Sequence, residues 1–501
     1  MNMELNYNIV AKLHEMAQKV PEKVAIVMQN KQISFKDLSM LVKRAASGFE
    51  NNGIAQGDSV VVMVPMSIDL YVVMLGAIHL GAVCIFFDPW LAGETVSNIV
   101  NAVDPKAFVS NWKGRLLCYK HAILRDIPVR IFSVKKLIAS QPIDRIFKAR
   151  EESRALITFS TGSSGVPKGA DRTHGFLLAQ HEALKESFPP HLVSLNMFPI
   201  FALNNLGCGT TSIIPSMNFK KVSDVNPRKI YQQIRKYAVT SCTASPPFFD
   251  QLAKFSGSDL TQIITGGGIV ADEQLRIWQK AFPNAEIIIA YGSTEAEPVA
   301  HITAEERLKV VPKIPGFCMG KPVPQIKAKI IKITTAPVLS LKDVELPLGE
   351  IGELVVSGDH VCKRYYQNPE ANRANKIHED GVVWHRMGDT GYLDEQGYFW
   401  LVGRVHSTIH FKDTLIHPQQ VDYLVRKNYS FVKHVAVVCV KDQLIIVTDT
   451  ELPKSETTHL LAENGIPVDV VLTLDQEFPV DPRHNTKIDY KKLAEIIEGK
   501  V

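Results

Sequence analysis

Short apolar runs alternate with amphipathic segments through most of the chain. The runs lie over Val24–Met28, Ser59–Val64, Ala82–Phe87, Leu156–Ser160, Leu195–Phe198, Thr211–Pro215, Gln262–Thr265 and Glu286–Ala290. Between them, Phe35–Asn51 and Pro227–Tyr237 carry apolar residues at the spacing of one helix face. Strands that alternate with helices in this way are typical of an α/β fold built on parallel sheets, which is the fold class we expect.

One long apolar stretch, residues 60–87, has the length of a membrane span. Pro65, Asp69 and His79 interrupt it, and no basic flank is present to anchor it in a bilayer. The alternative is a buried strand–helix–strand unit over Ser59–Val64, Ile68–Leu80 and Ala82–Phe87. We favour this unit and expect no transmembrane segment.

The pattern changes twice toward the C-terminus. From about Val323 the chain has short predicted strands over Ile326–Ile333, Gly352–Ser357 and Tyr398–Val402. After Arg404 the predicted elements are a helix over Val421–Arg426, strands over His434–Val440, Gln443–Thr448 and Val468–Leu472, and a helix over Tyr490–Glu498. We expect a large N-terminal domain over residues 1–403 with layered α/β subdomains and a β-rich subdomain, a hinge over 404–408 and a small α+β domain over 409–501.

Composition limits the function classes. The 501 residues are 46% hydrophobic and 22% charged, and the net charge of +4 argues against a nucleic-acid or membrane surface. The seven cysteines include no CxxC pair and no Cys/His cluster, so we expect reduced thiols and no zinc site. The amino terminus lacks the basic and apolar regions of a secretory signal, and we expect a cytoplasmic protein.

The run STGSSGVPKGA, residues 160–170, places hydroxyls, glycines and one lysine directly after a predicted strand. Exposed backbone N–H groups, hydroxyls and an ammonium group suit a bound polyphosphate. The run does not match the P-loop GxxxxGK[ST], because Pro167 takes the second glycine position and Gly169 follows Lys168. A polar surface turn is the alternative, but the order of residues is too specific for it, and we predict a phosphate-binding loop of another kind.

Four further segments carry candidate site chemistry. Glycines 266–268 end one predicted strand, and YGSTE, residues 291–295, ends another. Ligands of open α/β sheets gather at the carboxyl ends of strands, so we expect these loops to surround one site with the 160–170 run. Residues 385–404 hold Asp389 between two glycines, and residues 481–493 hold Lys487 ahead of a helix. Each residue alone is better explained as a turn or surface group, whereas the five segments together are not.

In the same order along the chain, these five segments resemble the motifs of the adenylate-forming superfamily, which includes acyl-CoA synthetases, luciferases and nonribosomal peptide adenylation domains. The resemblance covers nearly the whole chain and extends to Gln56–Val60 and Gly352–Leu354. It implies an AMP-forming ligase that activates a carboxylic acid with ATP and releases pyrophosphate. Because the carboxylate and the α-phosphate are both anions, this reaction needs cations and oriented donors more than an acid–base pair.

The resemblance also implies residue roles. The β- and γ-phosphates are expected on Ser160, Thr161, Gly162, Ser163, Ser164, Gly165 and Lys168. The adenosine is expected on Gly267, Gly268, Tyr291 and Gly292, and its ribose hydroxyls on Asp389 with Arg404 beside it. The catalytic residues are expected to be Thr294 at the α-phosphate, Glu295 as the Mg²⁺ ligand, and Lys487 between the carboxylate and the α-phosphate. ATP and Mg²⁺ are therefore the expected cofactors, and rotation of the small domain about the hinge is expected to withdraw its lysine after the first half-reaction.

The chain departs from the superfamily pattern in its last hundred residues. Ser407 stands where an acidic hinge residue is common, and Asp413 where CoA-using members usually carry a glycine. That glycine lets the pantetheine arm of CoA pass close to the backbone, so an aspartate there obstructs the arm and disfavours CoA as acceptor. The residues Pro482–Ile488 around Lys487 also differ from the usual P-x-T-x-x-G-K.

Three phrases point to one branch: FPIFALNN (198–205), VWHRMGDTGYLDEQG (383–397) and PVDPRHNTKID (479–489). They resemble the β-lactone synthetases of olefin biosynthesis, near the fatty-acyl-AMP ligases, which implies a fatty or 3-hydroxy fatty acid whose own hydroxyl attacks the adenylate. The alternatives are an acyl-CoA ligase, a ligase that loads a carrier protein, and a nucleotide-binding homologue without turnover. Candidate acyl-pocket residues, each of which could equally belong to the core, are Phe201, Asn204, Asn205, Leu206, Pro246, Pro247 and Phe248.

Overall fold

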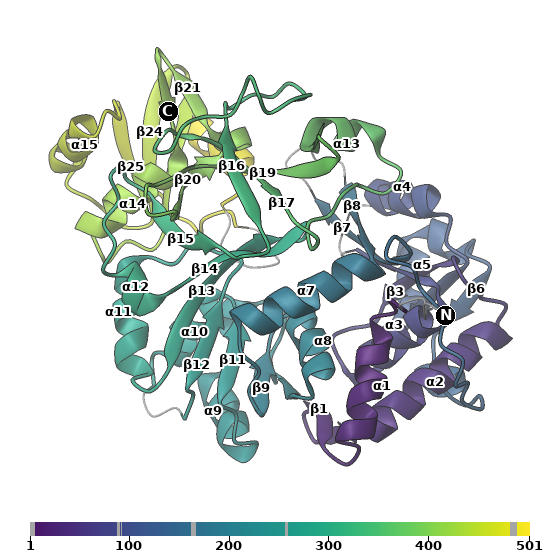
Figure 1. The fold of residues 1–501 in the computed structure, drawn as a ribbon. Coiled ribbons are helices and arrows are strands. Elements are labelled where there is room, and N and C mark those ends of the chain that lie inside the picture. The colour runs from purple at the N-terminus through teal and green to yellow at the C-terminus, as the bar shows by residue number, and fades with distance from the viewer. Residues whose placement is uncertain are drawn as a thin grey trace.

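A computed structural model describes residues 6–87, 91, 93–161, 167–255, 259–480 and 488–500, apart from the side chains of Ser160 and Thr161. These residues form two large sheets with helices on their faces and a smaller C-terminal part (Figure 1). The α/β fold class predicted from the sequence is confirmed. So is its arrangement as a large N-terminal region followed by a smaller C-terminal one.

The six-stranded sheet has the order β6-β5-β3-β4-β7-β8, and its neighbours are parallel except for β7 and β8. Its strands are β3 Ser59–Met63, β4 Val83–Phe86, β5 Ala107–Ser110, β6 Val129–Ile131, β7 Arg154–Thr161 and β8 Pro167–Thr173. Helix α3 (Ile68–Leu80) connects β3 to β4 and is buried on nearly every side, which explains its continuous apolar sequence. The strand–helix–strand interpretation of residues 60–87 is therefore confirmed. In the ranges given above, no helix is both long and apolar enough to cross a membrane.

The larger sheet has the order β16-β17-β19-β20-β15-β14-β13-β12-β11-β9-β10-β1-β2, with β18 paired to β19. Its strands are β1 Val24–Met28, β2 Lys31–Ser34, β9 Val193–Asn196, β10 Thr211–Ile214, β11 Ser241–Ala244, β12 Gln262–Thr265, β13 Glu286–Ser293, β14 Ala296–Thr303, β15 Phe317–Pro322, β16 Lys327–Ile331, β17 Gly352–Ser357, β18 Lys376–Glu379, β19 Val382–Leu393 and β20 Phe399–Arg404. The pairs from β1 through β10, β9, β11, β12 and β13 are parallel, and those from β13 to β16 are antiparallel. The predicted β-rich part is thus continuous with the parallel part.

Helices cover both sheets. They are α1 Val10–Lys19, α2 Phe35–Asn51, α4 Gly93–Val103, α5 Gly114–Lys120, α6 Val134–Leu137, α7 His174–Ser187, α8 Pro199–Cys208, α9 Pro227–Lys236, α10 Pro246–Leu252, α11 Asp272–Ala281, α12 Ala304–Arg307 and α13 Pro369–Asn375. α7 crosses in front of the region where the two sheets approach each other (Figure 1). It therefore lies where it can contribute side chains to a site between them.

The C-terminal part has a hairpin of β21 (Ile409–Phe411) and β22 (Thr414–Ile416) and a sheet of the order β23-β24-β25. The remaining elements are β23 Val435–Val440, β24 Gln443–Thr448, β25 Val470–Thr473, α14 Pro418–Asn428, α15 Lys454–Glu463 and α16 Tyr490–Glu498. The predicted antiparallel pairing of β23 and β24 is confirmed. α14 packs this part onto the large sheet, where the Tyr423 ring meets Phe317 edge-on at 5.5 Å.

The ends of β9, α14 and β25 differ from the predicted ends, because a proline or the pairing with a neighbouring strand sets them. β9 ends at Asn196 rather than Phe198, because α8 begins at Pro199 and Phe198 is its N-cap. α14 begins at Pro418, three residues before the predicted start, for the same reason. β25 covers Val470–Thr473 rather than Val468–Leu472, and its parallel register with β24 sets those ends.

A tight backbone contact between β14 and β15 joins the two parts of the large sheet. Gly320 has φ of +96°, and a Cβ there would lie 2.0 Å from the carbonyl oxygen of His301. Gly320→Ala is therefore expected to lower the free energy of unfolding by more than about 3 kcal/mol. Gly349 has φ of +85°, but no atom lies within 4 Å of an added Cβ. Gly349→Ala therefore has the backbone strain without the steric clash, and it should lower the free energy of unfolding by about 1 kcal/mol. Urea unfolding compares the two variants, and equal losses would contradict the assigned contact.

Candidate active site

The glycine- and hydroxyl-rich run is carried by the antiparallel pair β7–β8. Across this pair Ser160 is opposite Lys168 and Thr161 is opposite Pro167. The predicted contacts Gly162, Ser163, Ser164 and Gly165 lie outside the described residues, as do the side chains of Ser160 and Thr161 and the whole of Lys487. Among the predicted phosphate contacts, Lys168 at the start of β8 is therefore the one whose side chain can be related to the rest of the site.

The ends of β12 and β13 lie side by side, as the sequence predicts. Their parallel register pairs Thr265 with Ile289, so Gly266 passes so close to Ala290 that a Cβ would lie 2.9 Å from its carbonyl oxygen. Gly267, with φ of +80°, and Gly268 continue the turn. This edge thus presents backbone without side chains beside Tyr291, which is the surface that a flat ligand needs.

β13 does not end at Ala290, as the apolar pattern predicts, but runs on through Tyr291 and Gly292 to Ser293. The extra residues belong to the strand because β14 pairs back against them. A Cβ on Gly292 would lie 2.7 Å from the carbonyl oxygen of Ala296, so this glycine is also required by the turn itself. Thr294 and Glu295 are the two residues between the strands.

Glu295 lies where the two sheets meet. Its carboxylate Oε1 accepts a hydrogen bond from the Tyr365 hydroxyl at 3.0 Å, and its carbonyl oxygen accepts from the Cys362 backbone at 2.7 Å. The carbonyl oxygen of Thr294 accepts from Arg172 of β8 at 2.6 Å. The Lys168 ammonium lies 5.8 Å from the centre of the Tyr365 ring. The described end of the phosphate-type run and the strand-end glutamate therefore belong to one site.

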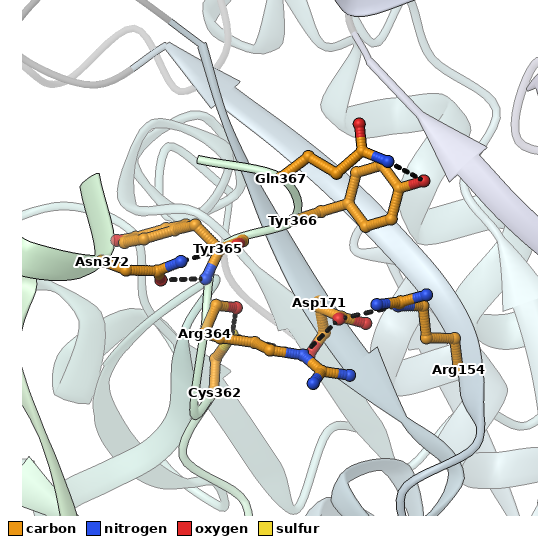
Figure 2. Close-up of polar contacts among 8 residues, drawn as sticks. All are labelled: Arg154, Asp171, Cys362, Arg364, Tyr365, Tyr366, Gln367 and Asn372. Atoms are coloured by element: carbon orange, nitrogen blue, oxygen red, sulfur yellow. Dashed lines mark hydrogen bonds and ion pairs between the residues drawn. The ribbon is translucent and has the colours of Figure 1, made fainter. Parts of the chain in front are cut away.

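Tyr365 is held by a polar network that Figure 2 shows. Asn372 accepts from its backbone N–H at 2.6 Å and donates to its carbonyl oxygen at 3.0 Å. On the other side of the segment, the buried Asp171 carboxylate accepts from Arg364 at 2.7 Å and from Arg154 at 2.9 Å. A pocket opens along these side chains and Tyr366. These bonds fix the segment from Cys362 to Asn372 against β8. They therefore also fix the Tyr365 ring, whose hydroxyl reaches Glu295.

The charges around Glu295 favour its ionised form. Burial opposes ionisation, but the Lys376 ammonium and the hydrogen bond from the Tyr365 hydroxyl favour it, and the pKa of Glu295 is lowered. Burial, followed by Lys376, lowers the pKa of His385 to about 3, so its ring is neutral near pH 7. Lys376 is therefore the cation near His385 that balances the Glu295 charge at neutral pH. Its ammonium donates to the carbonyl oxygen of Cys362 and lies 4.9 Å from the Tyr365 ring centre.

Asp389 and Arg404 face each other across β19 and β20, where the strand register makes them direct partners. Arg404 Nε lies 2.7 Å from Asp389 Oδ1, and the Tyr291 hydroxyl donates to Oδ2 at 2.6 Å. Burial and then Asp389 raise the pKa of Tyr291 well above its ordinary value, so the phenol stays a donor. This cluster joins the end of β13 to the antiparallel part of the sheet and can accept hydrogen bonds from a pair of hydroxyls.

The described residues can supply one carboxylate for a metal. Outside the undescribed segments, no three His, Cys, Asp or Glu side chains gather as a ligand set. Mg²⁺ is usually held by one or two carboxylates together with phosphate oxygens and waters, so Glu295, which stays partly accessible, fits it as a single protein ligand. The Lys168 ammonium, which interacts with Glu295, suits phosphate oxygens.

Sequence reasoning missed the residues that surround Glu295. The sequence patterns predict no role for Tyr365, Arg172 or Lys376. Their signal in the sequence is weak: Arg172 and Lys376 are charged residues within strands β8 and β18, yet both are buried, at 7% and 4% exposed. Because β8 reads PKGADRT and β18 reads KIHE, other polar residues surround both charges, and no pattern in the sequence marks them as buried.

The predicted acyl-pocket residues divide into two groups. Asn204 and Leu206 line a crevice between α7, α8 and α1, and Phe201 packs in the apolar cluster next to it. Phe248 is wholly buried in the core of the larger sheet, and Pro246 is buried at the start of α10, so both serve the fold. Pro247, the second residue of α10, is half-buried and does not line the crevice. Asn205 bonds Ser212 at 3.1 Å, which fixes α8 on β10.

Comparison with known proteins gives a family and a fold. A family model described as AMP-binding enzyme matches residues 13–366. The chain is 28% identical to the olefin beta-lactone synthetases of Stenotrophomonas maltophilia and Xanthomonas campestris, with 97% of each chain covered. It is 24% identical to 4-coumarate–CoA ligase 1 of Petroselinum crispum over 82% of this chain and 78% of that one.

Solved structures share the fold. ATP-bound MatB from Rhodopseudomonas palustris matches with a TM-score of 0.82 at 20% identity, with 99% of both chains covered. O-succinylbenzoate coenzyme A synthetase from Bacillus subtilis, in complex with AMP, matches with a TM-score of 0.79 at 18% identity, with 96% of this chain and 97% of that one covered.

Proposed function

The chain belongs to the family of AMP-binding enzymes and is an AMP-forming acid ligase, and we propose that its substrate is a 3-hydroxy fatty acid that it converts to a β-lactone. In the proposed reaction ATP and the acid give an acyl-adenylate and pyrophosphate. The acid's own hydroxyl then displaces AMP. The observation that carries this proposal is the similarity to olefin beta-lactone synthetases along 97% of both chains, whereas 4-coumarate–CoA ligase 1 matches over 82% of this one.

The first half-reaction brings together two anions, and the described side chains suit that task. We assign Asp389, with Arg404 and Tyr291, to the ribose hydroxyls and the base, because their buried carboxylate is oriented by two donors. Glu295 is assigned to Mg²⁺, which would neutralise phosphate charge when bound. Lys168 is assigned to the outer phosphates, and from sequence alone Lys487 to the reacting carboxylate and α-phosphate.

The second half-reaction needs no further substrate. The 3-hydroxyl oxygen forms a bond to the acyl carbon, the bond from that carbon to the phosphate oxygen breaks, and AMP leaves with the electron pair. The hydroxyl proton passes to solvent. Asp413 supports this route over thioester formation: it lies exposed in the two-residue turn between β21 and β22, where its side chain and charge would oppose the pantetheine arm of CoA.

The proposal is tested by acid-dependent exchange of pyrophosphate into ATP with 3-hydroxy and unsubstituted fatty acids. The expected result is exchange with both classes, and release of AMP with a β-lactone, detected by mass spectrometry, only from the 3-hydroxy acid and without CoA. Strict dependence of AMP release on CoA would favour a CoA ligase and overturn the assignment of Asp413. An acyl group transferred only to a carrier protein would favour the carrier-loading alternative, and no exchange with any acid would favour a homologue without turnover.

A further inference from the structure

One face of α7 lines an apolar crevice. Leu177, Gln180, His181 and Leu184 recur at the i, i+3, i+4, i+7 spacing that places side chains on a single helix face. The other walls come from the start of α1, from α3 and from α8, and the apolar lining residues are Ile9, Leu13, Leu75, Ile200, Leu203 and Leu206. Gln180 and His181 are the two polar members of that face, and Lys12 and Asn204 are the other polar residues that line the crevice.

Gln180 is only half-satisfied where it lies. Its side chain is 1% exposed, and its Nε2 donates to the carbonyl oxygen of Glu297 at 3.1 Å, which fixes the orientation of the amide. Its Oε1 has no hydrogen-bond partner among the described residues. Buried polar atoms are nearly always paired, so an unpaired acceptor that lines a crevice is available to a donor that enters it, whether from water or from a ligand. The other polar pair in the crevice does not need one, because His181 and Asn204 bond each other at 2.7 Å.

The position of Gln180 relates the crevice to the reacting centre. Glu297, to which its amide is tied, is two residues beyond Glu295 on the strand that leaves the candidate site. Under the proposed function the acid is activated near Glu295, and we place its first few carbons toward Gln180 and its alkyl chain along the apolar walls beyond. In a 3-hydroxy acid the hydroxyl is carried on the second carbon from the carboxyl carbon. It is therefore at the start of the chain, where an acceptor is required.

We propose that Gln180 is a specificity-determining residue, whose Oε1 accepts a hydrogen bond from the 3-hydroxyl of the acid while the alkyl chain occupies the crevice between α1, α7 and α8. This inference rests on the proposed function, since it names how that substrate class is selected. It also makes a chemical distinction: the amide oxygen accepts and cannot donate, so the substituent on the third carbon must carry a proton.

The wild-type enzyme tests the acceptor directly. Its kcat/KM in pyrophosphate exchange is measured with four acids of one chain length that carry hydroxyl, keto, methoxy or no substituent at the third carbon. The hydroxy acid is expected to be favoured roughly tenfold or more over each of the other three, because only it satisfies Oε1. A keto acid used as well as the hydroxy acid would overturn the proposal.

A variant identifies the residue. Gln180→Leu should bring the ratio of kcat/KM for the hydroxy and unsubstituted acids close to one, with exchange itself retained on the unsubstituted acid. Gln233→Leu is the matched control, because Gln233 also bonds backbone, at Ser216 N–H and the Ile214 carbonyl, but does so on α9 away from the crevice. An unchanged ratio in Gln180→Leu would overturn the inference. Absence of exchange from the wild type with every acid would instead count against the proposed function.

Discussion

Replacing Glu295 with glutamine is expected to lower the rate of acid-dependent pyrophosphate exchange by about 10²–10³-fold. Glutamine retains an oxygen that can accept from Tyr365, so the turn between β13 and β14 keeps its hydrogen bond. What is lost is the negative charge that Lys376 and Lys168 surround and that we assign to Mg²⁺. The Mg²⁺ concentration for half-maximal exchange should therefore rise in the variant.

Glu306→Gln is the matched control for this prediction. Glu306 accepts from the Tyr398 hydroxyl at 2.6 Å, so it makes the same kind of pair, but it belongs to α12 and bonds none of the described residues of the candidate site. The control should exchange at the wild-type rate. If Glu295→Gln did the same, with an unchanged Mg²⁺ requirement, the glutamate would have only the structural task of holding Tyr365.

Much of the fold was predictable because the apolar pattern of many single helices and strands marks where each one begins and ends. α2, α3, β1, β12, β17 and α16 have the ends that the apolar pattern predicts. The continuity of the large sheet was not predictable, because it depends on β14 and β15, whose pairing joins residues distant from the parallel strands. A change from a parallel to an antiparallel neighbour leaves no mark in the periodicity of either strand.

The candidate site could be predicted in part. The glycines after β12 and the turn that holds Glu295 have local signals in the sequence. Asp389 and Arg404 are brought together by the register of β19 and β20. The side chains that set the electrostatics come from elsewhere: Tyr365 reaches Glu295 across seventy residues, and Lys376 across more. No local pattern indicates that such groups meet, because the segment between β17 and β18 returns to the turn between β13 and β14 through backbone contacts between residues far apart in the chain.

Replacing Lys487 with alanine is expected to lower acid-dependent pyrophosphate exchange by about 10²–10³-fold while the dissociation constant for ATP changes by only a few fold. The resemblance places this ammonium between the carboxylate and the α-phosphate, where charge develops as they approach. The adenosine contacts that we assign, Tyr291, Asp389 and Arg404, are on the large sheet and remain in the variant. Lys491→Ala, on the exposed side of α16, is the control and should be neutral in both measurements.

A preformed acyl-adenylate separates the two half-reactions. If Lys487 acts only while the anions are brought together, the variant supplied with a synthetic 3-hydroxyacyl-adenylate should release AMP and lactone at close to the wild-type rate. A defect of equal size in both half-reactions would mean that the lysine supports the whole site. Normal exchange would mean that another cation serves the carboxylate, and Lys168 and Lys376 are the described residues to examine, because both ammonium groups interact with Glu295.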